Sequence, residues 1–281
     1  MTAVVRLDGS RPATDLSLAP VLARLDAWRA AGVDVAGVEI DHDCATAALP
    51  AYAAWLTRVR PPAPLRWSIT ALPTWAGAPA LRDVAAAVDE LVVQVHAIRA
   101  PRLFDAATAR RWLDAVAAAV PGATLRVALP TYRVAIDGEV AAAAPAEVAG
   151  LLRDLERAPV PGLRGVVWFR LPVDGDAAAW SAPTLRAVIR GDGLTSAVTA
   201  RLVARARGVY DVVLANPGTV DAPWPDLRVT GAVAAMDLIG GYAAPASSAR
   251  VWTAPRKVVR AGDHVVVGWA TGEDLEIDAN P

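Results

Sequence analysis

Apolar and polar residues alternate along several short stretches of the chain, most clearly over residues 37–43. There two aliphatic side chains alternate with the acidic residues Glu39, Asp41 and Asp43. Strict alternation is typical of a β-strand, in which successive side chains point to opposite faces. The three carboxylates therefore share one face of the predicted strand. Helix-like segments flank it on both sides, which predicts a covered sheet, and three carboxylates on a covered face require a function or a counter-charge.

Residues 1–192 alternate between predicted strands and predicted helices, and we interpret them as one domain. Strands are expected over residues 4–8, 35–43, 65–72, 90–98, 124–129 and 165–171. Helices are expected over residues 18–31, 46–60, 79–89, 105–120, 146–157 and 177–190. Strands that are separated by helices predict a parallel sheet.

Residues 193–281 follow a different pattern, which predicts a second domain. Strand-like segments with turn residues between them occupy 195–205, 210–215, 227–233, 250–259 and 264–269. This spacing is typical of a small antiparallel β-sandwich. We expect it to be a structural appendage that covers part of the first domain.

The strands of the first domain have one aliphatic face and one polar or aromatic face. By alternation, the polar face is expected to hold Arg6, Asp8, Glu39, Asp41, Asp43, Ser68, Thr70, Gln94, His96, Trp168 and Arg170. An open doubly wound sheet needs two apolar faces, because helices cover both. A closed barrel can have a polar interior near its C-terminal mouth, so the pattern favours a TIM-barrel-like (β/α) domain. Glycine-rich phosphate loops are absent, which argues against dinucleotide binding and predicts no cofactor.

Composition narrows the function further. Lys and Arg number 28 against 29 Asp and Glu, so the net charge of -1 gives no basic field for nucleic acid. The mean hydropathy of +0.33 comes largely from alanine, and the most apolar window, 134–152, contains three acidic residues, so no membrane-spanning segment is predicted. Cys44 is the only cysteine. As written, the chain has no leader and is expected in the cytoplasm, or in the periplasm or outside the cell if native sequence precedes Met1.

The chain carries an ordered set of motifs, Val38–Thr46, Ser68–Trp75, Val92–His96, Phe104–Leu113, Val127–Tyr132 and Val167–Pro172. Together these motifs resemble a bacterial family catalogued as domain of unknown function 3142. The resemblance runs from about residue 3 into the C-terminal β region. The family name itself implies no activity.

A more distant resemblance is to chitinase-like family 18 glycosidases, which carry Asp-Gly-x-Asp-x-Asp-x-Glu on the fourth barrel strand. Residues 36–43 fall on this pattern in register, with Ala36 and Glu39 in place of the first two Asp residues and Asp43 in place of the catalytic Glu. The same register makes residues 4–8 the third strand. It therefore implies a barrel that lacks its first two strands.

This second resemblance implies a carbohydrate-active, glycoside hydrolase-like barrel that acts on, or binds, an amino-sugar oligosaccharide or polysaccharide. In such enzymes the acetamido group of the substrate supplies the nucleophile. Asp43 would then be the general acid, Asp41 its partner and the group that orients the acetamido group, and Glu39 a support deeper in the barrel. The implied substrate-binding residues are Trp168 as the floor, with Tyr132, His96, Gln94, Arg170 and Trp75.

Other interpretations of the acidic strand stay open. The carboxylates could form a structural network with Arg6 and Arg170, because ion-pair networks also place acids together. A metal site of Asp41, Asp43 and His96 lacks metal-type spacing, so no metal is predicted. An Asp in place of Glu retracts the acid by one methylene group, which argues against catalysis. The alternative function is therefore a non-catalytic carbohydrate-binding or structural protein on the same scaffold.

Overall fold

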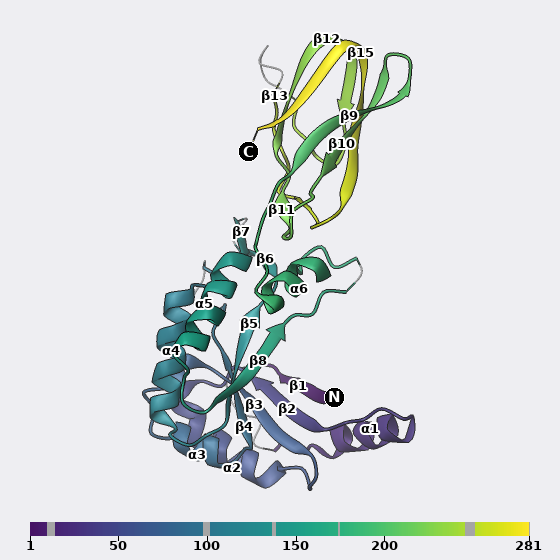
Figure 1. The fold of residues 1–281 in the computed structure, drawn as a ribbon. Helices are drawn as coiled ribbons and strands as arrows, with labels where there is room; N and C mark the ends of the chain where they lie inside the picture. Colours follow the sequence, from purple (N-terminus) through teal and green to yellow (C-terminus); the bar gives the residue numbers. More distant parts are fainter. Residues whose placement is uncertain (10–14, 98–101, 137–138, 174, 245–250, 281) are drawn as a thin grey trace. The chain divides into compact units, whose positions relative to one another are not determined.

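The computed structural model describes residues 1–9, 15–97, 102–136, 139–173, 175–244 and 251–280 (Figure 1). The chain divides into two compact units, Met1–Arg170 and Leu171–Pro281, and each is described by itself. The domain boundary predicted after residue 192 stays a prediction. Two predicted strands reach Ile98 and Arg250, and these two residues lie outside the described ones.

The first unit is built on a six-stranded parallel sheet, as the alternation of strands and helices predicts. The strands are β1 (Thr2–Leu7), β2 (Gly37–His42), β3 (Arg66–Ala71), β4 (Glu90–Gln94), β5 (Leu125–Pro130) and β8 (Leu163–Phe169). Their order in the sheet follows their order in the chain, because each helix carries the chain back to begin the next parallel strand alongside. Among the described residues the pairings leave β1 and β8 at the edges, so the sheet is barrel-like in its βα order while closure stays a prediction.

The helices of this unit match the predicted ones to within a few residues at their ends. They are α1 (Ala19–Ala30), α2 (Leu49–Val59), α3 (Leu81–Ala86), α4 (Ala106–Ala119) and α5 (Pro145–Arg157). Short 3₁₀ turns, η1 (Thr46–Ala48) and η2 (Pro73–Trp75), follow β2 and β3. Helices α2 to α5 succeed one another along one side of the sheet (Figure 1). The hairpin of β6 (Arg133–Ile136) and β7 (Glu139–Ala142) was not predicted.

The aliphatic face of the sheet forms the core of the first unit. Val38, Ile40, Ile69, Val93 and Val127 on this face are fully buried. Burying a side chain of this size contributes about 1.5–3 kcal/mol each. The predicted partition into one aliphatic face and one polar face is therefore what stabilises this layer, and it leaves the opposite face to polar groups.

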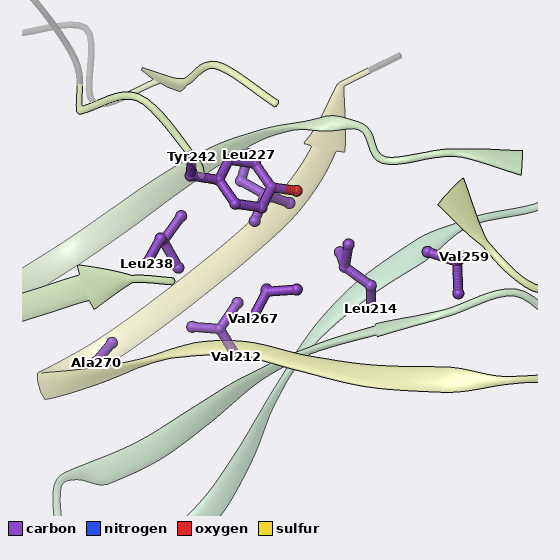
Figure 2. Packing of buried hydrophobic residues seen from close by; sticks show 8 residues of the cluster. All are labelled: Val212, Leu214, Leu227, Leu238, Tyr242, Val259, Val267 and Ala270. Carbon is purple, nitrogen blue, oxygen red and sulfur yellow. The ribbon is translucent and has the colours of Figure 1, made fainter. Parts of the chain in front are cut away.

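The second unit contains α6 (Ala182–Arg190) and two antiparallel sheets. The larger sheet has the order β13–β12–β15–β10–β9, and the smaller pairs β11 with β14. Their bounds are β9 (Thr199–Ala206), β10 (Val209–Ala215), β11 (Ala222–Pro223), β12 (Asp226–Leu238), β13 (Val251–Trp252), β14 (Val258–Val259) and β15 (His264–Asn280). Figure 2 shows the core, which comprises Val212, Leu214, Leu227, Leu238, Tyr242, Val259, Val267 and Ala270.

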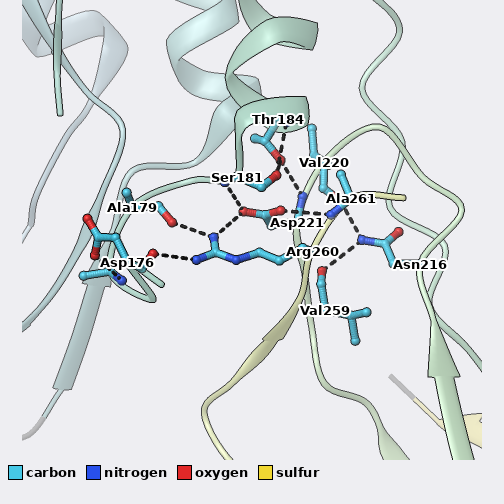
Figure 3. Close-up of polar contacts among 11 residues, drawn as sticks. Asp176, Ala179, Ser181, Thr184, Asn216, Val220, Asp221, Val259, Arg260 and Ala261 are labelled. Atoms are coloured by element: carbon cyan, nitrogen blue, oxygen red, sulfur yellow. Dashed lines mark hydrogen bonds and ion pairs between the residues drawn. The ribbon is translucent and has the colours of Figure 1, made fainter. Parts of the chain in front are cut away.

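A buried ion pair anchors the start of α6 within this unit (Figure 3). The Nη1 atom of Arg260 lies 3.0 Å from a carboxylate oxygen of Asp221. Arg260 also donates to the backbone carbonyls of Asp176 and Ala179, at 2.7 and 2.6 Å. Asp221 accepts the backbone N–H of Ser181, which in turn caps α6. Asp221 and Arg260 therefore hold the segment before α6 against the loops of the antiparallel sheets in this unit, which we call the β-domain.

Candidate functional site

Two of the three predicted acids share one arginine. Arg6 of β1 is paired in register with Asp41 of β2, and its Nη1 atom lies 2.8 Å from Asp41 Oδ1. Its Nη2 atom lies 2.5 Å from Asp43 Oδ2. The hydrogen bond to Asp43 and the charges of both acids raise the pKa of Arg6. The side chains of Arg6 and Asp43 are each 46% exposed and that of Asp41 is 21% exposed, so this ion pair faces solvent.

Glu39 lies deeper on the same face. Its Oε1 atom accepts a hydrogen bond of 2.9 Å from the hydroxyl of Thr70 on β3. Burial raises the pKa of the Glu39 carboxyl, and the charges of Asp41 and Glu90 add to this, while the Thr70 hydrogen bond opposes it. Glu39 therefore keeps its proton to a higher pH than an exposed glutamate would.

An ion pair that sequence reasoning missed continues this polar face. Glu90 of β4 and Arg126 of β5 are joined by an Nε–Oε1 contact of 2.8 Å. Position 90 lies an even number of residues before Gln94, so strand alternation places Glu90 on the polar face. That parity was a signal in the sequence, but the partner on β5 needed the register across the sheet.

Three aromatic rings gather at the carboxyl ends of β4, β5 and β8. His96 is stacked on Phe169, with ring centroids 5.5 Å apart and planes inclined by 22°. Tyr132 meets both rings edge to face, at 5.7 Å from His96 and 5.5 Å from Phe169. Phe169 is 47% exposed whereas His96 is 3% exposed. Burial lowers the pKa of His96 to about 4, so the ring that supports Phe169 is neutral at pH 7.

The predicted face of Trp168 is wrong. The parallel register pairs Gln94 of β4 with Ala128 of β5, and Ala128 with Val167 of β8. Phe169 follows Val167 by two residues and so lies on the polar face, whereas Trp168 lies on the other face, beside Leu129. The end of β8 is apolar or aromatic at several consecutive positions, so its sequence alone did not show which ones face the helices. Phe169 is the ring that sequence reasoning missed.

The other predicted residues have different surroundings. Gln94 donates its amide to the backbone carbonyl of His96 at 3.1 Å. Arg170 is close enough to Tyr132 for its charge to lower the pKa of that hydroxyl, although burial raises it overall. Arg6, rather than Arg170, is the cation seen between Asp41 and Asp43.

The prediction that Trp75 reaches the mouth is contradicted by its burial. Trp75 is fully buried, and its indole Nε1 donates to the carbonyl of Cys44 at 2.9 Å. Its ring also meets Tyr52 edge to face. The 3₁₀ turn η2 directs this ring into the core, so it ties the end of β3 to the end of β2.

In the part of the chain that the structure describes, no group of three His, Cys, Asp or Glu side chains is arranged to hold a metal ion. The same residues contain no helix that is both long enough and apolar enough to span a membrane. The polar face instead carries two clusters. One is the carboxylate cluster of Arg6, Glu39, Asp41, Asp43 and Thr70, and the other is the aromatic cluster of His96, Tyr132 and Phe169.

This arrangement offers two kinds of chemistry on one face of the sheet. The carboxylate cluster can accept hydrogen bonds and, at Glu39, hold a proton. The aromatic cluster presents one exposed ring beside a phenol hydroxyl. The carboxylate cluster lies on β1, β2 and β3, and the aromatic cluster lies at the ends of β4, β5 and β8. Because β3 and β4 are neighbours in the sheet, the two clusters are adjacent on one face.

Comparison with solved structures finds chitinases and spore-related enzymes. A GH18 chitinase from Pseudoalteromonas aurantia is 17% identical, with a TM-score of 0.40 over 60% of this chain and 70% of its own. The spore cortex-lytic enzyme SleL of Bacillus cereus is 12% identical, with a TM-score of 0.42 over 69% and 60%. A sporulation-specific glycosylase, ydhD, from Bacillus subtilis is 17% identical, with a TM-score of 0.33 over 49% of this chain and 51%, about half, of its own. None of these scores establishes a shared fold.

Both units of the chain contain residues that match a protein-family model. No curated protein matches it. Residues 199–273, in the β-domain, match a domain of unknown function, DUF8456. Residues 1–142, which include β1 to β7 and both clusters except Phe169, match the domain of unknown function DUF3142. The chain belongs to the DUF3142 family.

Proposed function

We propose that the polar face of the parallel sheet binds a carbohydrate, with Phe169 as its aromatic platform. The observation that carries this proposal is the exposed Phe169 ring, which is stacked on the buried His96 and flanked by Tyr132. A sugar ring has one apolar C–H face and a rim of hydroxyl groups. An aromatic ring that is supported by a buried ring and is itself exposed can pack on the C–H face. Polar groups beside it can bind the hydroxyl groups.

The hydroxyl groups of such a sugar need acceptors and donors near the platform. The Tyr132 ring meets Phe169 edge to face, and its hydroxyl, which lies 3.4 Å from His96 Nδ1, can donate or accept. Asp41 and Asp43 are acceptors, each held in place by Arg6. Charge-assisted hydrogen bonds of this kind are stronger than neutral ones, so the acids would favour a ligand that is rich in donors.

A second candidate function is hydrolysis of an amino-sugar polymer, with Asp43 as general acid and Asp41 as its partner. The placement of both oxygens on one guanidinium favours it, because it brings the two carboxyl groups together. Both carboxylates accept hydrogen bonds from Arg6, however, so an ion pair accounts for their placement without catalysis, and Asp43 is one methylene group shorter than the glutamate of the glycosidase pattern. Binding without turnover is therefore the better-supported function.

Titration with chitooligosaccharides, followed by calorimetry, tests the binding proposal. Cellooligosaccharides of equal length are the matched control, since they lack the acetamido group. Saturable binding of either series supports a carbohydrate site, and tighter binding of the chitooligosaccharides identifies an amino sugar. Failure of both series to bind would favour a purely structural role for this face.

Turnover of the same chitooligosaccharides separates the two functions. If Asp43 is the general acid, Asp43→Asn abolishes release of shorter products while Asp43→Glu retains or increases it, because glutamate restores the reach of the acid. If the protein only binds, wild type and both variants release no product. Glu147→Gln on α5 is a control for loss of an exposed carboxylate.

A further inference from the structure

A cavity of about 400 Å³ lies between the end of β4 and the first turns of α4. It is formed largely by the motif Phe104–Leu113, which the proposed carbohydrate site does not use. Val95 lines it, and alternation along the strand directs Val95 away from the polar face that holds His96. The cavity is therefore on the helix side of the sheet, and its volume falls within the usual range for small-molecule sites.

The lining of this cavity changes from apolar to cationic between its inner end and its rim. Val95, Leu103 and Phe104 are buried and form the inner wall. Trp112 of α4 is half-buried and adds an aromatic side, while Arg102 and Arg111 at the rim are exposed. A molecule that fits this lining has an apolar body and an anionic end.

Among the described residues that line the cavity, the cations outnumber the anions by one. Two arginines face one acid, Asp105, and that acid is already engaged as the N-cap of α4. It accepts the Thr108 N–H at 2.8 Å and Arg102 Nη1 at 3.3 Å. Hydrogen bonds from Thr108, together with the charges of both arginines, lower the pKa of Asp105, so it remains ionised beside them.

Arg111 retains most of its hydrogen-bonding capacity. A guanidinium has five N–H donors, and the contact with the Thr108 hydroxyl at 2.9 Å uses one of them. A planar fork of donors suits a carboxylate, which can accept two parallel hydrogen bonds. The Thr108 contact also fixes the side chain relative to α4 and so reduces the entropy that is lost when a ligand binds.

A backbone hydrogen bond joins two of the residues that line the cavity. The N–H of Ala97 donates to the carbonyl of Leu103 at 2.8 Å. Ala97 lines the cavity and has a φ of 55°, in a region that residues with a side chain rarely adopt. The tight bend after β4 thus forms part of the cavity lining.

We propose that this cavity is a second binding site, for a small molecule with an apolar ring at one end and a carboxylate at the other. The ring packs between Trp112 and the buried inner wall, and the carboxylate accepts hydrogen bonds from Arg111 and Arg102 at the rim. This site is separate from the carbohydrate face, and its occupancy does not depend on whether that face binds sugar.

Binding of phenylacetate to the full chain tests the proposal, with 2-phenylethanol as a neutral compound of similar shape. Both are titrated by calorimetry and by the NMR shift of the Trp112 indole N–H, which is assigned from its loss in Trp112→Phe. We expect phenylacetate to bind at least about tenfold more tightly than the alcohol, and high salt to weaken it. We also expect the Arg102→Gln/Arg111→Gln variant to remove most of this preference.

Arg157→Gln on α5 removes an exposed arginine outside the cavity and should leave the affinity unchanged. Circular dichroism of each variant checks that the fold is retained. Equal affinity for acid and alcohol would overturn the carboxylate assignment. A preference for phenylacetate that survives the double variant, or binding that does not shift the Trp112 signal, would put the ligand elsewhere and overturn the site.

Discussion

The side chains of Phe169 and His96 are stacked, with ring centroids 5.5 Å apart and planes inclined by 22°. The stack joins the edge strand β8 to the end of β4, although β5 lies between them in the sheet. One ring is exposed and the other is buried, so the pair combines a surface for a ligand with a rigid support. The first prediction concerns the supporting ring.

His96 should make the protein less stable in mild acid. Its pKa in the folded state is lowered to about 4 by burial, whereas an exposed histidine has a pKa near 6.5. The unfolded chain therefore binds the proton first, and stability falls as the pH drops from about 6.5 to about 4, by up to about 3 kcal/mol. We expect His96→Gln to remove most of this loss, as measured by urea unfolding at pH 7 and pH 4.

His264→Gln is the matched control, because His264 is exposed in the β-domain. It should leave the pH dependence of unfolding as it is in the wild type. An unchanged acid dependence in His96→Gln would show that His96 is not held neutral by burial.

Glu39 should have the opposite effect on pH dependence. Burial and the neighbouring acids raise its folded-state pKa, so the folded chain binds the proton more tightly than the unfolded chain does. This contribution is present at low pH and is lost as the pH rises through the folded-state pKa. Glu39→Gln keeps an acceptor for Thr70 and should raise Tm at pH 8 more than at pH 4, relative to the wild type. An equal change in Tm at pH 4 and pH 8 would contradict this. So would the same pH-dependent rise in Tm in the control Glu156→Gln, because Glu156 is exposed.

The Arg6 ion pairs should contribute little to stability. All three partners are partly exposed, and exposed pairs contribute about 1 kcal/mol or less. We therefore expect Arg6→Gln to lower the free energy of unfolding by no more than about 1 kcal/mol, and less at high salt. A loss several times larger would mean that the carboxylate cluster is a structural network rather than part of a binding surface.

The Asp221–Arg260 pair should contribute much more, because Asp221 is almost fully buried and Arg260 is largely so. Arg260→Met leaves a buried carboxylate without its cation and should cost about 3 kcal/mol. Burial alone would raise the pKa of Asp221, but hydrogen bonds from Ser181, Ala261 and Arg260 outweigh it and lower the pKa. Stability from this pair is therefore lost as the pH falls below the usual range for aspartate. Urea unfolding checks this, with the exposed Arg228→Met as a control that should change little.

Most of the first unit was predictable because apolar and polar residues alternate along its strands. Glu39 and Asp41 on β2 alternate with buried aliphatic residues, and the helices end at proline or glycine near the expected positions. The β6–β7 hairpin was missed because its strands are short and rich in alanine, so they lack a clear polar period.

The partners in the site were less predictable than its strands. Parity within β2 places its acids on one face, but the pairing of Asp41 with Arg6 depends on the register between two strands. At the end of β8, Trp168 and Phe169 are adjacent aromatic residues, and only the register with β5 shows which one joins His96. Trp75 follows a strand end like a site residue, yet a 3₁₀ turn directs it into the core.

The most direct test of the carbohydrate proposal is the affinity of chitooligosaccharides and cellooligosaccharides for Phe169→Ala. If Phe169 is the platform, this variant loses at least about tenfold in affinity for whichever series the wild type binds, since covering a phenylalanine side chain contributes on the order of 1.5–3 kcal/mol. Trp28→Ala, which removes a similarly exposed aromatic ring from α1, should bind as the wild type does. Unchanged affinity in Phe169→Ala, or an equal loss in Trp28→Ala, would contradict the assignment of this face as the sugar-binding surface.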